Sequence, residues 1–95
     1  MKSSKERKKQ QRLRRCVAEL TNLARETAPI VEVRELAPCE DEDVVLEICV
    51  PTGFEEQIGE ALYERRFDMF LNEGVFVSLQ VLPDEELMAV ERREE

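Results

Sequence analysis

The stretch VVLEICV at residues 44–50 limits the possible folds more than any other part of this chain. Its residues are apolar except for Glu47, and most are β-branched, so the stretch predicts a β-strand. A nearly continuous apolar run is typical of a central strand that is covered on both faces. Glu47 would then need a partner, because an unpaired carboxylate is costly to bury, and Arg34 can supply one.

Two further strands are predicted, one on either side of this run along the chain. Residues 30–36 (IVEVREL) and 75–82 (VFVSLQVL) are rich in branched apolar side chains, and the second segment alternates cleanly. About seven residues separate the first strand from the central one, which is too few for a parallel crossover, so we expect an antiparallel pair. The longer connection to the third strand favours a parallel βαβ unit.

That longer connection predicts a helix from a capping box at Thr52–Glu55 to about Asn72, with Gly74 as a natural stop. Its apolar positions recur at helical spacing and predict the stripe that faces the core. The stripe consists of Phe54, Ile58, Leu62 and Met69, and it is widened by Tyr63, Phe67, Phe70 and Leu71. Gly59 lies in the helix interior, where close packing of the helix on the sheet would explain it.

A second capping box, at Ser3–Glu6, predicts an N-terminal helix that ends near Arg25. The apolar face of this helix is confined to its second half, at Leu13, Val17, Leu20 and Ala24. Residues 1–12 are therefore interpreted as either a solvated helical extension or a frayed tail.

The complete pattern predicts an α+β fold with the order α-β-β-α-β-(α), in which helices pack on a small mixed three-stranded sheet. The final helix is a short one expected over residues 84–90, with acids in its first turn. Residues 13–90 would form a single domain, preceded by the basic segment 1–12 and followed by a charged tail at 91–95.

The charge distribution along the chain is strongly uneven. The formal net charge is −8, yet residues 1–15 carry eight Lys or Arg against one Glu, so their charge is +7 and that of the remainder is −15. A basic segment of this kind can contact phosphates, which makes nucleic acid a possible partner. The candidate contacts are Lys5, Lys8, Lys9, Arg12 and Arg15. The alternative is a solvated helix end, or a tail that folds against the acidic body.

Composition excludes several kinds of site. There is no histidine, which removes zinc–histidine sites and Ser-His or Cys-His nucleophile pairs. The cysteines, Cys16, Cys39 and Cys49, form no CxxC motif and their number is odd, so they are interpreted as small apolar residues of a protein in a reducing cytoplasm. No apolar run is long enough to span a membrane, and no glycine-rich phosphate loop occurs.

The acids before the central strand are the candidate metal ligands. Asp41 and Asp43 alternate, so on an extended chain they point the same way and can share a hard cation such as Mg²⁺. Glu47 is a further, weaker candidate on the strand itself. The alternative is a solvated acidic turn without a metal.

Residues 56–87 resemble the crossover helix and following strand of small, stand-alone nucleotidyltransferase-like domains of the polymerase-β type. The resemblance extends over about residues 13–88, and it places residues 41–43 near the D-x-D motif of that family. The matching positions are Glu60–Glu64, Phe67, Leu71, Gly74, Val75, Val77 and Ser78. It implies a nucleotidyltransferase-like architecture, and a role beside a small partner protein.

Two elements of the catalytic machinery of that family are missing. Residues 36–40 lack the Gly-Ser loop that holds nucleotide phosphates, and residues 77–81 offer no third carboxylate. We therefore expect a catalytically inactive member that binds a protein partner, which includes a second copy of itself, or nucleic acid. The alternatives are an active Mg²⁺-dependent nucleotidyltransferase that uses Asp41 and Asp43, and an unrelated ferredoxin-like α+β interaction domain.

Overall fold

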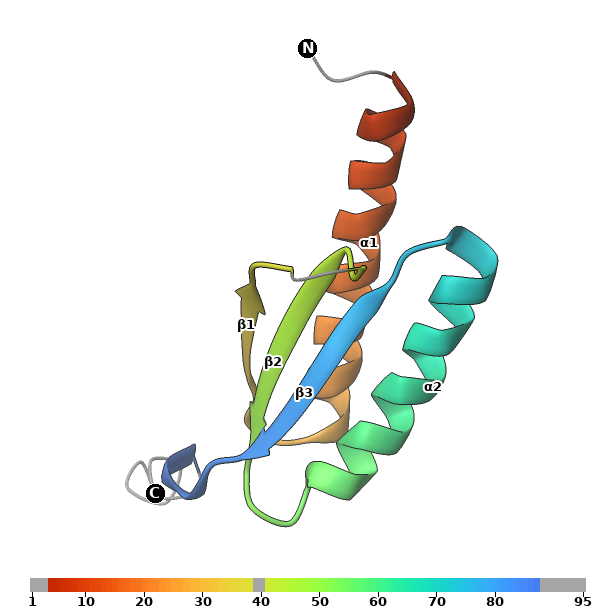
Figure 1. Cartoon of the computed structure of the whole chain (residues 1–95). Coiled ribbons are helices and arrows are strands. Elements are labelled where there is room, and N and C mark those ends of the chain that lie inside the picture. The colour runs from red at the N-terminus through yellow and green to blue at the C-terminus, as the bar shows by residue number, and fades with distance from the viewer. Residues whose placement is uncertain (1–3, 39–40, 88–95) are drawn as a thin grey trace.

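A computed structural model describes residues 4–38 and 41–87 of the chain. The predicted α+β class and element order are confirmed (Figure 1). The elements are α1 (Ser4–Thr27), β1 (Glu32–Leu36), β2 (Val44–Val50), α2 (Glu55–Glu73) and β3 (Val77–Pro83).

The sheet has the order β1-β2-β3. As predicted, β1 is antiparallel to β2, and β3 is parallel to it. Both ends of β3 are fastened to β2 by backbone hydrogen bonds: the Asp43 N–H donates to the Phe76 carbonyl at 2.8 Å, and the Asp84 N–H donates to the Val50 carbonyl at 2.7 Å. These two bonds fix the register of the parallel pair.

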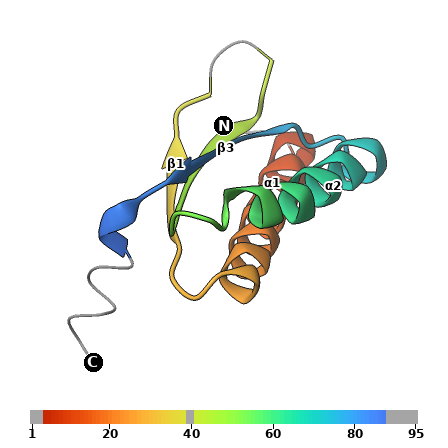
Figure 2. The ribbon, with the colours of Figure 1, turned by 90° about the horizontal axis from the view of Figure 1, so that it is seen from below.

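Both helices lie on the same side of the sheet (Figure 2). The core lies between them and the β2 face formed by Val44, Leu46, Ile48 and Val50. β2 is the central strand, and its side chains are buried on both faces as expected, with only Glu47 partly exposed. The helices cover just one of these faces (Figure 2), so the burial of Val45 and Cys49, which are 7% and 9% exposed on the other face, does not come from a helix.

The N-terminal helix is longer than expected. It continues to Thr27, whose hydroxyl donates to the Leu23 carbonyl at 2.7 Å, instead of ending near Arg25. Its basic half is helical from Ser4 onwards and projects beyond the sheet (Figure 1). Of the two interpretations of residues 1–12, the helical extension is therefore correct for residues 4–12.

The boundaries of α2 confirm one predicted cap and correct the other. The helix begins at Glu55, and its N-cap is Phe54, which makes no side-chain cap bond; the Glu55 carboxylate instead accepts the Gly53 N–H at 2.5 Å. Gly74 ends the helix as predicted, with φ 70° and its N–H donating to the Phe70 carbonyl at 3.1 Å. Glycine suits this left-handed position because it has no Cβ.

The remaining boundaries differ little from the sequence predictions. β1 begins at Glu32 instead of residue 30, and β3 runs from Val77 to Pro83 instead of from 75 to 82. Residues 85–87 form a helical turn where the terminal helix was expected, and residues 88–90 lie outside the described part.

The apolar stripe of α2 is narrower than predicted. Ile58, Leu62 and Met69 are buried as expected. The residues expected to widen the stripe are largely exposed: Tyr63 43%, Phe67 58%, Phe70 49% and Leu71 63%. The reason is geometric: α1 and the sheet cover α2 from one side only, and these four side chains lie outside that contact. Apolar side chains of this size in solvent form a surface feature that needs its own explanation.

The explanation offered for Gly59 is also corrected. A Cβ built at Gly59 would lie 3.3 Å from Cε2 of Tyr63, and no sheet atom lies among its near contacts. The glycine therefore makes room for the tyrosine ring along the helix.

Candidate functional site

Asp43, a predicted metal ligand, is held by contacts within the chain. Its carboxylate accepts the Phe76 N–H at 2.8 Å, and its Oδ1 lies 3.0 Å from the Lys9 ammonium. Only 19% of the side chain is exposed. Asp43 thus joins the start of β2 to the start of β3 and to the projecting half of α1.

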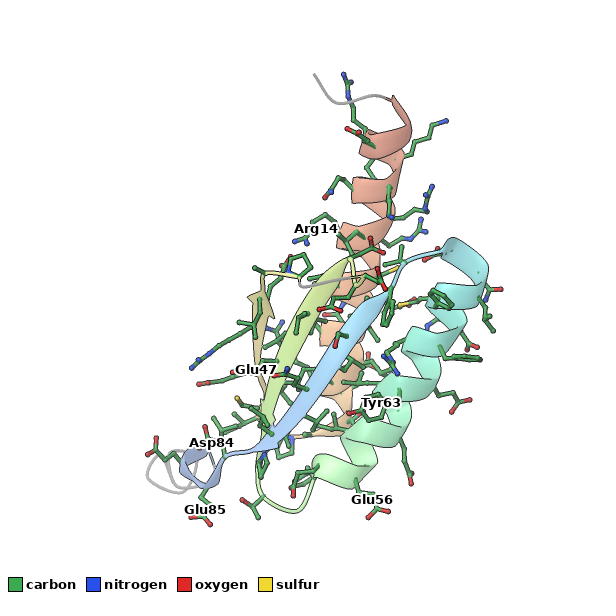
Figure 3. The ribbon with its side chains drawn as sticks, in the orientation of Figure 1. Arg14, Glu47, Glu56, Tyr63, Asp84 and Glu85 are labelled. Carbon is green, nitrogen blue, oxygen red and sulfur yellow. The ribbon has the colours of Figure 1, made fainter. Side chains whose placement is uncertain are left out.

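The other two predicted ligands have different surroundings. Asp41 is exposed, whereas Glu47 lies within the sheet with its Oε1 3.8 Å from Nη1 of Arg34 (Figure 3). The ion-pair partner predicted for Glu47 is therefore present. Across residues 4–38 and 41–87, no three His, Cys, Asp or Glu side chains are grouped so as to hold a metal ion.

The five predicted phosphate contacts on α1 differ in whether a carboxylate of the chain already binds them. Lys9 contacts Asp43 and Arg15 contacts Glu73, so two of the five predicted phosphate contacts already have carboxylate partners. Lys8 is exposed and Arg12 is half-buried, with no hydrogen-bond partner for its Nε. Lys5 lies in the first helical turns.

A further basic residue, which the sequence analysis did not single out, is also paired. Arg14 donates to both carboxylate oxygens of Glu35 in β1 (Figure 3). This bond lowers the pKa of Glu35 and raises that of Arg14. Basic residues of α1 therefore form ion pairs with acids of three other segments: Glu35 on β1, Glu73 on α2 and Asp43 before β2.

Glu73, at the C-terminal end of α2, receives two donors from α1. A carboxylate is unfavourable there because the helix dipole is negative at that end. The Cys16 thiol lies 2.9 Å from Oε2 of Glu73, and Arg15 binds Oε1. The hydrogen bond from Cys16 and the charge of Arg15 lower the pKa of Glu73. The pKa of Cys16 is raised to about 12, mainly by burial and to a smaller extent by the hydrogen bond to Glu73.

We expect the Cys16 thiol to be unreactive in the folded chain. Because its pKa is raised to about 12, alkylation by iodoacetamide at pH 8 should be on the order of 10²–10³-fold slower than in urea-unfolded chain. The raised pKa also means that Cys16 contributes stability below about pH 9, which is lost as the pH rises towards 12. Mass spectrometry of the labelled peptides measures the rate, and equal rates in both states would contradict the buried hydrogen bond.

A shallow apolar groove lies where α2 meets the start of β3. Its volume is about 120 Å³, and it is lined by Arg66, Phe67, Phe70, Phe76 and Val77. The rings of Phe70 and Phe76 meet edge to face, with centroids 5.7 Å apart. This groove joins the exposed side chains of α2 to β3. We use the name aromatic surface for Tyr63, Phe67, Phe70 and Leu71 together with the groove.

Arg66 forms the polar border of the groove. Its Nη1 donates to the Val77 carbonyl at 3.3 Å, and its guanidinium carbon lies 5.4 Å from the centroid of the Tyr63 ring. The Nε of Arg66 is buried without a hydrogen-bond partner. Arg66 therefore fixes one side of the groove between a strand carbonyl and an aromatic face.

The sequence contained a signal for the aromatic surface that the prediction did not use. Phe67, Met69, Phe70 and Leu71 lie within five consecutive residues of one helix, so they point to more than one side of it. A single core-facing stripe cannot contain all four, which indicates a second apolar face.

Comparisons of the chain with protein-family models, with curated proteins and with solved structures found no match. Neither helix, over the residues described, is long and apolar enough to cross a membrane.

Proposed function

We propose that the chain is a protein-binding domain without nucleotidyl-transfer activity, and that the aromatic surface of α2 is its docking site. The observation that carries this proposal is the exposure of Phe67, Phe70 and Leu71, at 58%, 49% and 63%. Together with Tyr63 they expose roughly 400 Å² of apolar side chain, if a full aromatic side chain buries about 200 Å². A patch of this size on a small domain is often a binding site.

The surroundings of Asp43 support a role in binding and not in transfer. Its carboxylate is already used by Lys9 and by the Phe76 N–H, so the recruitment of a metal would have to displace both contacts. Under this proposal the likeness to nucleotidyltransferase-like domains is one of architecture alone. The proposed compartment is the cytoplasm, which suits the free, buried thiols of Cys16 and Cys49.

A photo-crosslinking amino acid placed at position 67 tests the docking site in cells that express the chain. We expect a covalent adduct with a protein from position 67 and none from position 25, where Arg25 is exposed on α1. Adducts in equal amount from both positions, or none from either, would rule out the aromatic surface as the docking site.

Nucleic-acid binding by α1 is a second candidate, favoured by a separate observation. The basic half of α1 projects beyond the sheet (Figure 1), and Arg7 and Lys8 are exposed there without an ion pair to any described residue. Against it, the carboxylates that hold Lys9, Arg14 and Arg15 compete with phosphates for those cations.

The double substitution Arg7→Gln/Lys8→Gln distinguishes this candidate. If both side chains contact phosphates, the slope of log affinity for duplex DNA against log salt concentration should fall by nearly two. Far-UV circular dichroism checks that the variant keeps its helix content. Unchanged affinity and slope would remove α1 as a phosphate-binding element.

A further inference from the structure

Four acids follow one another along the outward side of α2 at a spacing of four residues. They are Glu56, Glu60, Glu64 and Asp68, here called the acidic stripe. The three glutamates are exposed, and no ion pair joins them to any residue in the described ranges. Asp68 lies near Arg65, whose guanidinium is bound to Glu19 on α1. The stripe is therefore largely uncompensated within the chain.

Like charges four residues apart repel one another on a helix surface, so the acidic stripe weakens α2. A helix that needed only to pack on its own core would gain from a lysine or arginine at one of these positions. The cost is relieved when cations of another molecule approach the outward side of α2.

The acidic stripe and the aromatic surface adjoin each other. Glu56 and Glu60 occupy the first half of α2, whereas Phe67, Phe70 and Leu71 occupy the second half. In helical projection the acids and the apolar side chains share the side opposite to buried Leu62 and Met69. One elongated surface thus presents carboxylates along most of α2, and in its second half apolar side chains and a groove lie beside them.

We propose that the occupant of this surface is a basic amphipathic helix of another protein. Its apolar residues would enter the groove beside Phe70 and cover Phe67, as amphipathic helices do in apolar grooves. Its lysine or arginine residues would lie over the acidic stripe. This inference rests on the proposed function and adds the chemistry of the partner to it.

The negative charge of the acidic stripe favours a basic helix over the other possible partners of this surface. Nucleic acid and anionic membranes carry the same sign as the acidic stripe, so they are repelled from α2. A second copy of the chain would bring the same acids and a formal charge of −8 against an equal charge. The basic segment of a second copy has few apolar side chains to offer, because Leu13 and Cys16 are buried in its own core.

The chain carries its own reporter for this surface. Tyr63 (Figure 3) is the single tyrosine and there is no tryptophan, so intrinsic emission reports on Tyr63, which is 43% exposed and lies one helical turn before Phe67. The probes are two synthetic helical peptides with the same leucine stripe and without aromatic residues, one with lysine and one with glutamate at its polar positions. A third peptide keeps the lysines and has serine in place of leucine.

We expect only the peptide with both lysine and leucine to change Tyr63 emission saturably. Phe67→Ala should weaken its binding about tenfold, because a truncated anchor of an interface commonly costs that much. Glu60→Gln/Glu64→Gln should weaken it several-fold and reduce its salt dependence. The matched controls, Leu36→Ala on β1 and Glu26→Gln on α1, should bind as the wild type does.

Equal binding by the lysine and glutamate peptides, or wild-type affinity of Phe67→Ala, would overturn the inference. Sedimentation of the wild type and of Phe67→Ala gives a separate outcome. Suppose that the wild type dimerises, that Phe67→Ala does not, and that the lysine peptide does not bind. The occupant of the surface would then be a second copy of the chain instead of a basic helix, and the docking site itself would stand. A photo-crosslink at position 67 without peptide binding would likewise contradict only the stated partner chemistry.

Discussion

Leu62→Ala will lower the free energy of unfolding by about 2–5 kcal/mol, the usual cost of a cavity at a buried leucine. Leu62 is 0% exposed and belongs to the core between the two helices and the sheet. Leu71→Ala, on the same helix, removes the same atoms from a side chain that is 63% exposed. It should change stability by no more than about 0.5 kcal/mol. Urea denaturation followed by far-UV circular dichroism measures both values.

The comparison of the two leucines also tests whether the aromatic surface is free in the isolated chain. If Leu71→Ala were as destabilising as Leu62→Ala, the Leu71 side chain would be packed in solution. The docking site would then be part of the core, and the proposed function would lose its main support.

Asp43→Ala will lower the free energy of unfolding by about 1–3 kcal/mol, because it leaves the Phe76 N–H without its acceptor and removes the ion pair with Lys9. Asp41→Ala is the matched control two residues away: its side chain is exposed, so the change should stay within about 0.5 kcal/mol. Thermal or urea denaturation of both variants supplies the comparison.

The substitution Asp43→Asn distinguishes the contribution of the hydrogen bond to Phe76 from that of the ion pair with Lys9. Its amide oxygen can still accept the Phe76 N–H, but it has no charge for Lys9, so stability should recover most of the way to the wild-type value. Equal losses in Asp43→Asn and Asp43→Ala would show that the ion pair carries the effect. Equal losses at Asp41 and Asp43 would contradict the structural role given to Asp43.

The strands and helices were largely predictable because their signals are local. The branched apolar run at 44–50, the seven-residue gap before it and the glycine at position 74 each report on their immediate neighbours. The N-terminal end of α2 was less predictable: the Glu55 carboxylate binds the Gly53 N–H, which places the helix start later than Thr52 suggested.

The surface of α2 was not predictable from periodicity alone. Which apolar residues of a helix are buried depends on how many sides its neighbours cover, and periodicity does not report the neighbours. Phe67 and Phe70 are as apolar as the core residues of α2, yet α1 and the sheet leave them in solvent. The placement of both helices on one face of the sheet (Figure 2) could likewise not be predicted, because the apolar run of β2 reports burial and not which element supplies it.

The ion pairs of α1 could not be predicted from the sequence either. Arg14 and Glu35 are 21 residues apart, and Arg15 and Glu73 are 58 apart. Nothing in the local pattern links these positions, because the contact depends on where α1 crosses the sheet. The charge balance left three outcomes open for the basic segment: contact with phosphates, a solvated helix end, or folding against the acidic body.

The hydrogen bonds that fasten β3 at both ends, Asp43 to Phe76 and Asp84 to Val50, have a consequence for local opening. β3 is an edge strand, so the consequence concerns the amide protons that it donates to β2: because both ends of the strand are held, these protons should exchange with solvent mainly when the whole domain unfolds. The groove wall formed by Phe76 and Val77 is then as long-lived as the native state itself. A partner would meet a surface that is already rigid, and it would lose little entropy in ordering it.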